Sequence, residues 1–496
     1  MTGITPLKDY TPMIQSTTPA GPQPVARPAL AMIGVNLMVF MATLDMSIVN
    51  VALPTLTESL DTDFATIQWV ILSYVLVIAS LLLLISRLGD MRDKKRIFSA
   101  GLVLFILASL CCGLSPSVYW LIGFRALQGI GAAMSQSLGM AIVTQIAPPA
   151  SRGRALGFIG GTVAMGLMIG PPLGGVIIGL AGWRALFLLN VPLGILAFVA
   201  VRRYMPSLPP VRQGEQFDVP GAILACLTLA CYCLGMTFMQ RHGLTDPLAL
   251  GLLGISAAGM AAFIVVERQS ASPMLDLSLF SNPLVSLPLA MSVLVFITGA
   301  SGFIMPFFLQ SAQGHSVTQV GLMLMILPAS MAITAPLSGS LADRYGTRVI
   351  SLVGLLVLLG GCLALGTLTE HTPWWGYLLR SMPVGLGIGI FQAPNNSTIM
   401  GQMPPHRLGV GSGLANYARV FGQSTGLPLV GTIFSGLVAA SGTVASHADF
   451  TNAPPAALAA GVAGVFHALS GMLVLAIALA AWAWKLETAK ARKARS

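Results

Sequence analysis

Long apolar segments alternate with short polar stretches over most of this chain, from about residue 30 to residue 485. A helix needs about 20 mostly apolar residues to cross a hydrocarbon core of about 30 Å, so each such segment is a candidate membrane span. This criterion predicts fourteen spans. They lie near residues 30–55, 66–86, 97–115, 118–146, 154–180, 184–203, 218–239, 246–266, 284–310, 317–341, 349–368, 374–399, 409–438 and 457–484.

Part of the sequence recurs after an interval of about 250 residues. The segment SRLGDMRDKKR (86–96) returns as GSLADRYGTR (339–348), and LIGFRALQGIG (121–131) returns as YLLRSMPVGLG (377–387). A third match pairs PPASRGRALG (148–157) with PPHRLGVGSG (404–413). Parallel repeats of this kind bracket a substrate path at their interface in transporters. The expected fold class is therefore an all-α polytopic membrane protein with two six-helix bundles and two extra helices between them.

The domain organisation follows from the repeat and from the composition of the ends. The first residues are rich in Pro, Thr and Gly and lack the features of a signal peptide. We expect a disordered cytoplasmic tail at 1–28, an N-terminal bundle at 29–204, a linker with two additional helices at 205–272, a C-terminal bundle at 273–486 and a basic cytoplasmic tail at 487–496.

Composition supports a lipid environment, because 55% of the residues are hydrophobic and only 8% are charged. A soluble protein carries roughly a quarter charged residues. The 26 basic residues exceed the 16 acidic ones, and most of the basic residues lie in loops that follow even-numbered spans. Positive residues stay in the cytoplasm, so both termini are expected there, in the inner (cytoplasmic) membrane of a bacterium. This distribution explains the basic excess without a nucleic-acid partner.

Enzyme chemistry finds no support in the sequence. The six cysteines all lie in apolar runs and have neither zinc-site nor disulfide spacing. We find no nucleophile triad, metal cluster or phosphate-binding loop. The sequence therefore predicts neither an enzyme nor a nucleotide-driven pump, and it predicts no cofactor and no metal site.

Asp45 is the only charged residue between Leu30 and Leu56. A charge near the bilayer centre costs roughly 2.5–3.5 kcal/mol on insertion scales and is usually functional. Counting about 1.5 Å per residue from the span ends places Asp45 and Arg125 at similar depths, so the two side chains can form a pair. Two roles remain open: a fixed ion pair that specifies packing, or a titrating carboxylate whose protonation responds to burial, Arg125 and water.

Four motifs give the chain a resemblance to the fourteen-span drug:proton antiporters of the major facilitator superfamily (QacA/EmrB/SmvA-like). They are LDMSIVNVALP in the first span, the two basic loops, Arg125 with Gln128 in the fourth span, and a glycine pattern in the fifth. The later loop fits the family pattern G-x-L-x-D-R-x-G-R-K well, whereas the first departs at Ser86, Met91 and Asp93. The resemblance implies the fold of that superfamily and export coupled to protons.

The loop motifs are candidate gating elements, because a short basic loop with one Asp can pin neighbouring helix ends through charge-assisted bonds. A plain positively charged cytoplasmic loop is the alternative. The candidate gating residues are Arg87, Gly89, Asp90, Asp343, Arg344 and Gly346.

The fifth span fits the family's antiporter pattern G-x8-G-x3-G-P-x2-G-G at every position. The residues are Gly157, Gly166, Gly170, Pro171, Gly174 and Gly175. Small residues four apart let helices approach closely. The resemblance to the drug:proton antiporters implies that this motif seals the exporter against leak across the membrane. It therefore favours export over import. Ordinary glycine-rich packing is the alternative.

Further polar and aromatic residues are candidates for a substrate cavity, since aromatic faces attract lipophilic cations. They are Trp69, Tyr74, Gln128, Phe307, Arg380, Phe391, Asn416, Tyr417 and Arg419. Lipid-facing or packing roles are the alternative for the aromatic ones. The second half has no carboxylate at the depth of Arg380 and Arg419, which disfavours dicationic substrates.

The sequence thus predicts a monomeric exporter of small amphipathic compounds or drugs, driven by the proton gradient. One alternative is an exporter of a dedicated anionic or lipid-like metabolite, suggested by the intramembrane arginines. An importer or facilitator is disfavoured by the fifth-span motif, and a non-transporting scaffold is disfavoured by the buried charges.

Overall fold

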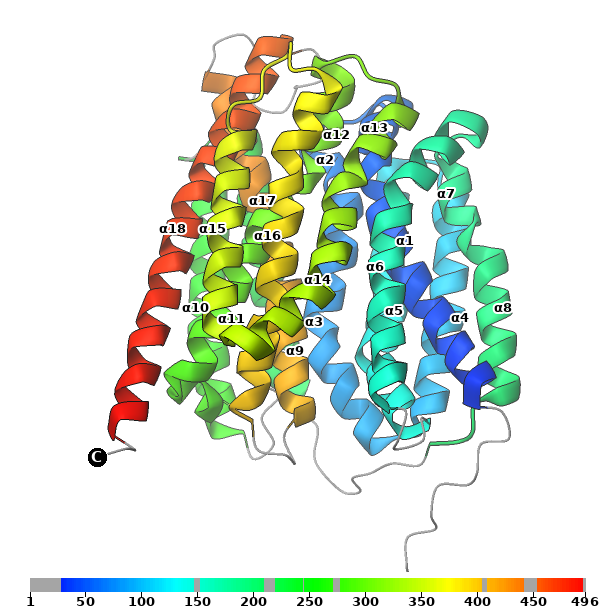
Figure 1. Cartoon of the computed structure of the whole chain (residues 1–496). Coiled ribbons are helices and arrows are strands. Elements are labelled where there is room, and N and C mark those ends of the chain that lie inside the picture. The colour runs from blue at the N-terminus through cyan, green and yellow to red at the C-terminus, as the bar shows by residue number, and fades with distance from the viewer. Residues whose placement is uncertain are drawn as a thin grey trace, which may run out of the picture.

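The computed structural model describes residues 28–146, 152–208, 219–243, 245–270, 277–403, 408–440 and 453–493 (Figure 1). Within these ranges every regular element is helical. The long helices are α1 (Pro28–Ser59), α3 (Trp69–Met91), α4 (Lys94–Gly113), α5 (Val118–Ile146), α6 (Arg152–Ala181), α8 (Asn190–Tyr204), α9 (Val219–His242), α10 (Pro247–Gln269), α11 (Pro283–Gly299), α14 (Ile326–Tyr345), α15 (Thr347–Leu365), α16 (Trp374–Gly401), α17 (Leu408–Ala440) and α18 (Pro455–Lys493). Short helices connect them: α2 (Phe64–Ile67), α7 (Arg184–Leu188), η2 (Leu277–Ser281), η3 (Ala300–Phe303), α12 (Met305–Phe307), η4 (Phe308–Ala312) and α13 (Val317–Leu324).

Twelve helical segments in the described residues are long and apolar enough to cross a membrane. The predicted spans near 374–399 and 409–438 are helices α16 and α17, but they are not among these twelve. Both carry polar residues in their interiors, including Arg380 and Arg419, which lower their average hydropathy. Hydropathy therefore supports about twelve spans and not the predicted fourteen.

Two predicted segments differ from simple helices. The ninth, near 284–310, is divided into α11, η3, α12 and the short π-helix η4, in a stretch that contains Gly299, Gly302 and Pro306. Helix α18 continues to Lys493, so residues 487–493 extend a helix and do not form a separate tail. The other tail, predicted at 1–28, lies outside the described residues except for Pro28.

Helix α1 begins, and α18 ends, at the lower end of the bundle in Figure 1, so the two termini of the described chain lie on one side. The opposite, upper end is where α1 ends and α3 begins. Helices α1–α8 form the first half and α11–α18 the second. The inserted helix α9 packs against α3 of the first half and α17 of the second, and α10 packs against α9.

The two halves meet closely near the upper end. Thr318 at the start of α13 donates a hydrogen bond to the carbonyl of Gly175 in α6 over 3.1 Å. Gln310 donates to the carbonyl of Val51 in α1 over 3.3 Å. Phe64 of α2 stacks on Phe303, with ring centroids 5.6 Å apart. These contacts close the interface between the halves at the upper end.

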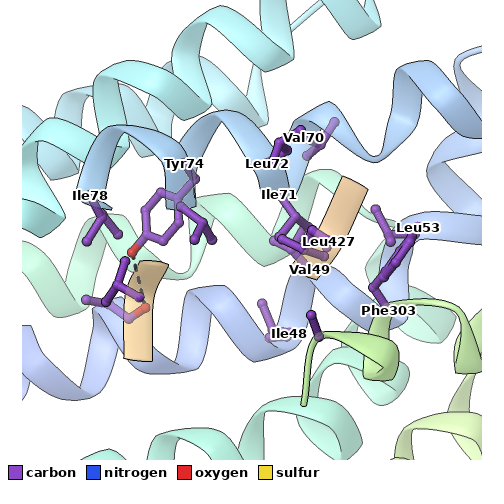
Figure 2. Close-up of a cluster of buried hydrophobic side chains, with 14 of the residues drawn as sticks. Ile48, Val49, Leu53, Val70, Ile71, Leu72, Tyr74, Ile78, Phe303 and Leu427 are labelled. Atoms are coloured by element: carbon purple, nitrogen blue, oxygen red, sulfur yellow. Dashed lines mark hydrogen bonds between the residues drawn. The ribbon is translucent and has the colours of Figure 1, made fainter. Parts of the chain in front are cut away.

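A continuous apolar core runs through this interface (Figure 2). Ile48 and Leu53 of α1 and Ile71 of α3 lie near Phe303 and Leu427 of the second half. All five side chains are at most 5% exposed. Apolar burial therefore joins the halves as well as filling each of them.

Helix α9 adds a polar seam at the same end. Gln68 donates to Gln240 over 2.6 Å, and the indole nitrogen of Trp69 donates to Thr237 over 3.1 Å. Arg241 forms an ion pair with Asp63, with the closest atoms 3.1 Å apart. Because these bonds join α9 to α2 and α3, the inserted pair is an integral part of the upper interface.

Helices α1 and α6 pack through the predicted glycine motif. Gly166 and Gly170 of α6 lie against Thr43 and Ser47 of α1, and Ser47 donates to the carbonyl of Gly166 over 3.1 Å. A methyl group added at Gly170 would lie only 1.8 Å from the hydroxyl oxygen of Ser47. The motif thus sets how closely the two helices approach.

We expect Gly170→Ala to destabilise the protein by about 1–3 kcal/mol, because overpacking must push α6 away from α1. The measurement is thermal unfolding in detergent. Gly161→Ala, in the same helix, is the matched control, because no atom lies within 4 Å of the added methyl position. Equal unfolding temperatures for the two variants would show that the close approach at Ser47 has no role in stability.

Candidate functional site

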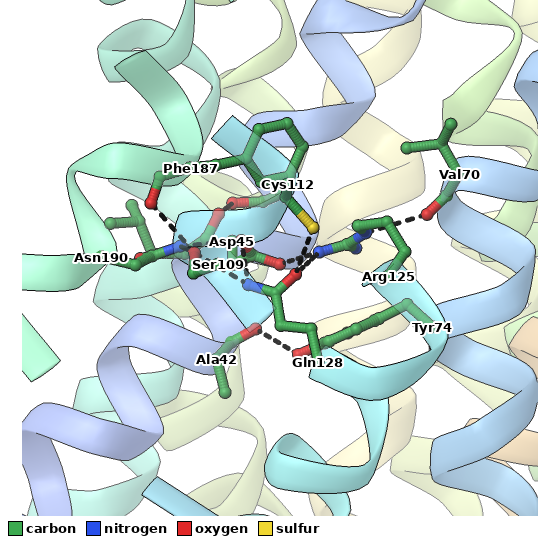
Figure 3. Close-up of polar contacts among 12 residues, drawn as sticks. Ala42, Asp45, Val70, Tyr74, Ser109, Cys112, Arg125, Gln128, Phe187 and Asn190 are labelled. Carbon is green, nitrogen blue, oxygen red and sulfur yellow. Dashed lines mark hydrogen bonds and ion pairs between the residues drawn. The ribbon is translucent and has the colours of Figure 1, made fainter. Parts of the chain in front are cut away.

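Asp45 of α1 and Arg125 of α5 form an ion pair in the interior of the first half (Figure 3). Both side chains are fully buried. Each comes from a long apolar helix, and α1 packs directly against α5. The predicted pairing of these two residues is therefore seen in the structure.

The Asp45 carboxylate accepts hydrogen bonds on both oxygens. One oxygen accepts from the amide nitrogen of Asn190 over 2.9 Å and from that of Gln128 over 3.1 Å. The other accepts from Arg125. Three donors from α5 and α8 thus stabilise the ionised carboxylate, and its charge is balanced by a guanidinium in direct contact.

Arg125 is held from several sides. Its Nε donates to the carbonyl of Val70 in α3 over 2.9 Å, and one terminal nitrogen also donates to the side-chain oxygen of Gln128 over 2.6 Å. The guanidinium carbon lies 4.1 Å from the centre of the Tyr74 ring. The hydroxyl of Tyr74 in turn donates to the carbonyl of Ala42 in α1 over 3.2 Å. Hydrogen bonds and a cation–π contact therefore fix the arginine against α1 and α3.

Asn190 and Ser109 belong to this cluster and were not predicted from the sequence. Asn190 donates to Asp45 and also to the hydroxyl of Ser109 in α4 over 3.1 Å. Ser109 donates to the carbonyl of Phe187 over 2.9 Å. Asn190 is the only side-chain amide in the span near 184–203, a signal that could have singled it out. Ser109 has no such signal, since serine is common in these helices.

Of the predicted cavity residues, Tyr74 and Gln128 belong to the ionic cluster and are fully buried. Phe307 packs edge-on against Phe64 at the upper interface, with ring centroids 4.9 Å apart. Phe391 is fully buried, and its backbone lies against Gly354 of α15. Trp69 contacts α9, as described above. The structure therefore places these aromatic side chains in separate packing contacts.

The remaining cavity candidates lie in the second half. Arg380, in the second turn of α16, donates to the hydroxyl of Thr367 and to the carbonyl of Gly376, each over 3.0 Å. These bonds hold it beside the 366–373 connection and not deep in the bundle. Arg419 donates twice to the side-chain oxygen of Asn416, over 2.7 and 3.2 Å. Tyr417 stacks on Phe421 with ring centroids 5.9 Å apart.

The predicted gating residues lie at the lower ends of helices. Gly89, near the end of α3, is buried against Leu138 of α5. Asp343 and Arg344 are exposed in the last turn of α14. Gly346 follows with φ +91°, a backbone conformation that favours glycine. The side chains of Arg87 and Asp90 lie outside the described part of the chain.

The antiporter motif is divided between two neighbours of α6. Gly166, Gly170 and Gly174 face α1, whereas Gly175 lies against the backbone of Val317 and Thr318 in α13. The carbonyl of Pro171 lies against Gly321 of α13. Gly157 is in α6, but its packing lies outside the described residues. One helix motif therefore contacts both halves.

Metal chemistry has no site in the described ranges, where no three His, Cys, Asp or Glu side chains are grouped to hold an ion. The ionic cluster offers one buried carboxylate whose charge is balanced by one buried guanidinium.

Comparison with known proteins places this geometry in a family. The model described as Major Facilitator Superfamily matches residues 35–427. The chain is 35% identical to "Uncharacterized transporter YebQ" of Escherichia coli (strain K12), over 81% of this chain and 88% of that protein. It is 30% identical to "Riboflavin transporter RibZ" of Clostridioides difficile (strain 630), over 80% and 86% of the two chains. It is 32% identical to "Multidrug resistance protein Stp" of Mycobacterium tuberculosis, over 83% and 77%.

A solved structure has the same fold. The crystal structure of a bacterial homologue of the human lysosomal transporter Spinster aligns with a TM-score of 0.68 at 18% sequence identity. The alignment covers 92% of this chain and 97% of that chain. At this identity the likeness concerns the fold alone.

We expect Asp45→Asn to lower the free energy of unfolding by about 3–5 kcal/mol, because it leaves the Arg125 guanidinium buried without its counter-ion. The double variant Asp45→Asn/Arg125→Gln removes both charges and should lose less than the sum of the two single losses. Thermal unfolding of Asp45→Asn, Arg125→Gln and the double variant completes a double-mutant cycle. Glu58→Gln, at an exposed carboxylate of the same helix, controls for the loss of a charge in α1. Strictly additive losses would contradict the coupling of the pair.

Proposed function

Because the chain belongs to the Major Facilitator Superfamily, we propose that it is a proton-coupled exporter of small amphipathic compounds. The chain is a polytopic membrane protein, and several relatives are named as multidrug resistance or export proteins. Proton coupling and antiport are the proposed refinements. The exporter would work as a monomer with the proton gradient as its energy source and without a cofactor.

The observation that carries the proposal is the fully buried pair of Asp45 and Arg125. Protonation of Asp45 removes its negative charge and leaves Arg125 without a counter-ion. The hydrogen bonds from Gln128 and Asn190 also lose strength when their acceptor becomes neutral. The protonated state therefore favours a different arrangement of α1 relative to α5 and α8. A helix arrangement that depends on one proton is the element that coupled transport requires.

The proposed topology has fourteen spans and both termini in the cytoplasm of a bacterium. Helices α16 and α17 contain 28 and 33 residues and run between the same two ends of the bundle as their neighbours (Figure 1). Helices of this length are long enough to cross, because 20 residues reach about 30 Å. The basic loops at the lower end support a cytoplasmic position for that end under the positive-inside rule.

Arg419 is the proposed contact for the polar part of a substrate. Each residue advances 100° around a helix, so the neighbours of α17 define where Arg419 points. Gly422 and Gly426 face α11 and η3, and Gly431 faces Gln68, the residue just before α3. Around the helix, Arg419 lies between the side of Gly426 and the side of Gly431, and it points away from α9. We therefore infer that it faces the interface of the two halves. Leu408 begins the helix, so Arg419 lies about 16 Å from its start.

Arg419 also supports a second candidate function, export of a dedicated anionic or lipid-like metabolite. Its hydrogen bonds go to the neutral Asn416, which leaves the positive charge of the guanidinium uncompensated by that contact. A riboflavin transporter among the relatives is consistent with a dedicated metabolite as substrate. An importer or facilitator is a weaker candidate, because the family's antiporter motif is complete in α6.

We expect Asp45→Asn to abolish substrate efflux driven by a proton gradient while retaining substrate–substrate exchange across the same membrane. Exchange requires the helices to move but no net proton transfer. Both rates are measured in proteoliposomes with a fluorescent lipophilic cation as the probe, and Glu58→Gln is the control. If Asp45→Asn does not fold, Asp45→Asn/Arg125→Gln replaces it. Uphill efflux at the wild-type rate would exclude Asp45 as the coupling residue.

We also expect dicationic compounds to be transported at least several-fold more slowly than matched monocationic ones. Like charges repel more strongly in a partly dry interior than in water, and Arg419 faces the substrate path. Asn416→Asp places a carboxylate beside Arg419 and should raise dication transport, whereas the isosteric Asn36→Asp in the first half should not. Uptake into inverted vesicles measures the ratio. Efficient dication transport by the unmodified protein would show that Arg419 is not on the path.

A further inference from the structure

A groove opens between α4 and α8 at the lower end of the bundle, away from the ionic cluster. Its volume is about 770 Å³. The two helices touch at the upper end of the groove, where Gly194 of α8 lies directly against Ile106 of α4. The lining includes Lys95, Arg96, Ala100, Val103, Leu107 and Arg202.

The lining is divided by polarity along the helix axes. Lys95 and Arg96 lie in the first turn of α4, and Arg202 lies in the last turn of α8, so the basic groups gather at one end. Above them the walls are apolar, from Val103 to Leu107. From Arg96 to Leu107 the helix rises about 16 Å, which matches half of a hydrocarbon core of about 30 Å. The groove therefore has the length and polarity of one lipid leaflet.

The basic end of the groove is preformed. The Lys95 ammonium donates to the carbonyl of Arg202 over 3.2 Å and to that of Met205, which ties the end of α8 to the start of α4. Asp93 is the one acidic side chain in the lining. One of its oxygens accepts from the backbone amides of Lys95 and Leu208, over 2.9 and 3.1 Å.

The charges at this end leave an excess of positive charge that faces outward. Arg96 is 89% exposed and lies 3.9 Å from the second oxygen of Asp93, a distance too long for a hydrogen bond. Arg202 is also exposed. Three basic side chains against one acidic one give this rim a net charge of +2, beside apolar walls that must lie in lipid.

We propose that this groove binds one anionic phospholipid, with its headgroup phosphate at Arg96 and Arg202 and an acyl chain along Val103 and Leu107. Basic pockets between membrane helices on the cytoplasmic side select anionic headgroups through such contacts. The lower end is cytoplasmic in the topology proposed above, but lipid binding itself requires no transport activity. The lipid bridges α4 and α8, which also supply Ser109 and Asn190 to the Asp45 cluster.

Native mass spectrometry of the purified full-length chain tests the proposal with dioleoyl phosphatidylglycerol and the zwitterionic dioleoyl phosphatidylethanolamine. We expect one tightly bound phosphatidylglycerol. The double variant Arg96→Gln/Arg202→Gln should weaken its binding by about 30-fold, the ratio expected for two basic contacts at a headgroup. Arg203→Gln/Arg268→Gln is the matched control, because these arginines are exposed at the same end but do not line the groove.

A second variant tests the apolar part of the groove. Ala100→Trp fills the groove while every charge stays in place, so it should also abolish tight lipid binding. If the double arginine variant does not fold, Ala100→Trp alone tests the proposal. Unchanged affinity in Arg96→Gln/Arg202→Gln or in Ala100→Trp would overturn the proposal. Equal affinity for the two lipids, or equal loss in the control, would also overturn it.

Discussion

The burial of one carboxylate with one guanidinium is the constraint that organises the first half of this protein. Neither Asp45 nor Arg125 is exposed, and a buried charge without compensation is strongly destabilising. Both charges therefore require partners from other helices. Val70 of α3, Gln128 of α5 and Asn190 of α8 supply them. The relative positions of α1, α3, α5 and α8 follow from satisfying one ion pair.

Helix α1 transmits this constraint to the interface between the halves. It carries Asp45 at the cluster and Ser47 at the contact with Gly166 and Gly170 of α6. Helix α6 in turn contacts α13 through Gly175. Helix α1 also contacts the second half directly, since the carbonyl of Val51 accepts a hydrogen bond from Gln310. The glycine contacts leave little room for adjustment between α1 and α6, because no side chain on the glycine side can yield.

The inserted pair α9–α10 does more than link the two halves along the chain, because α9 is bonded to both of them. Gln240, Thr237 and Arg241 of α9 bond to residues of α2 and α3, and Thr432 of α17 donates to the carbonyl of Met236 over 3.0 Å. One helix is therefore hydrogen-bonded to both halves at the upper end. Any transport cycle that separates the halves at that end must break or carry along these bonds.

The sequence by itself determined the helical class, the family resemblance and the pairing of Asp45 with Arg125. Each rests on a pattern that is local or periodic: apolar length, a repeated motif, or two charges at matching depths. Tertiary structure alone decided the rest. Asn190 and Ser109 joined the cluster because α4 and α8 converge there, and Arg380 contacts Thr367 because the 366–373 connection lies beside the start of α16. Which face of a membrane helix meets protein and which meets lipid depends on neighbouring helices, because both surroundings accept the same apolar side chains.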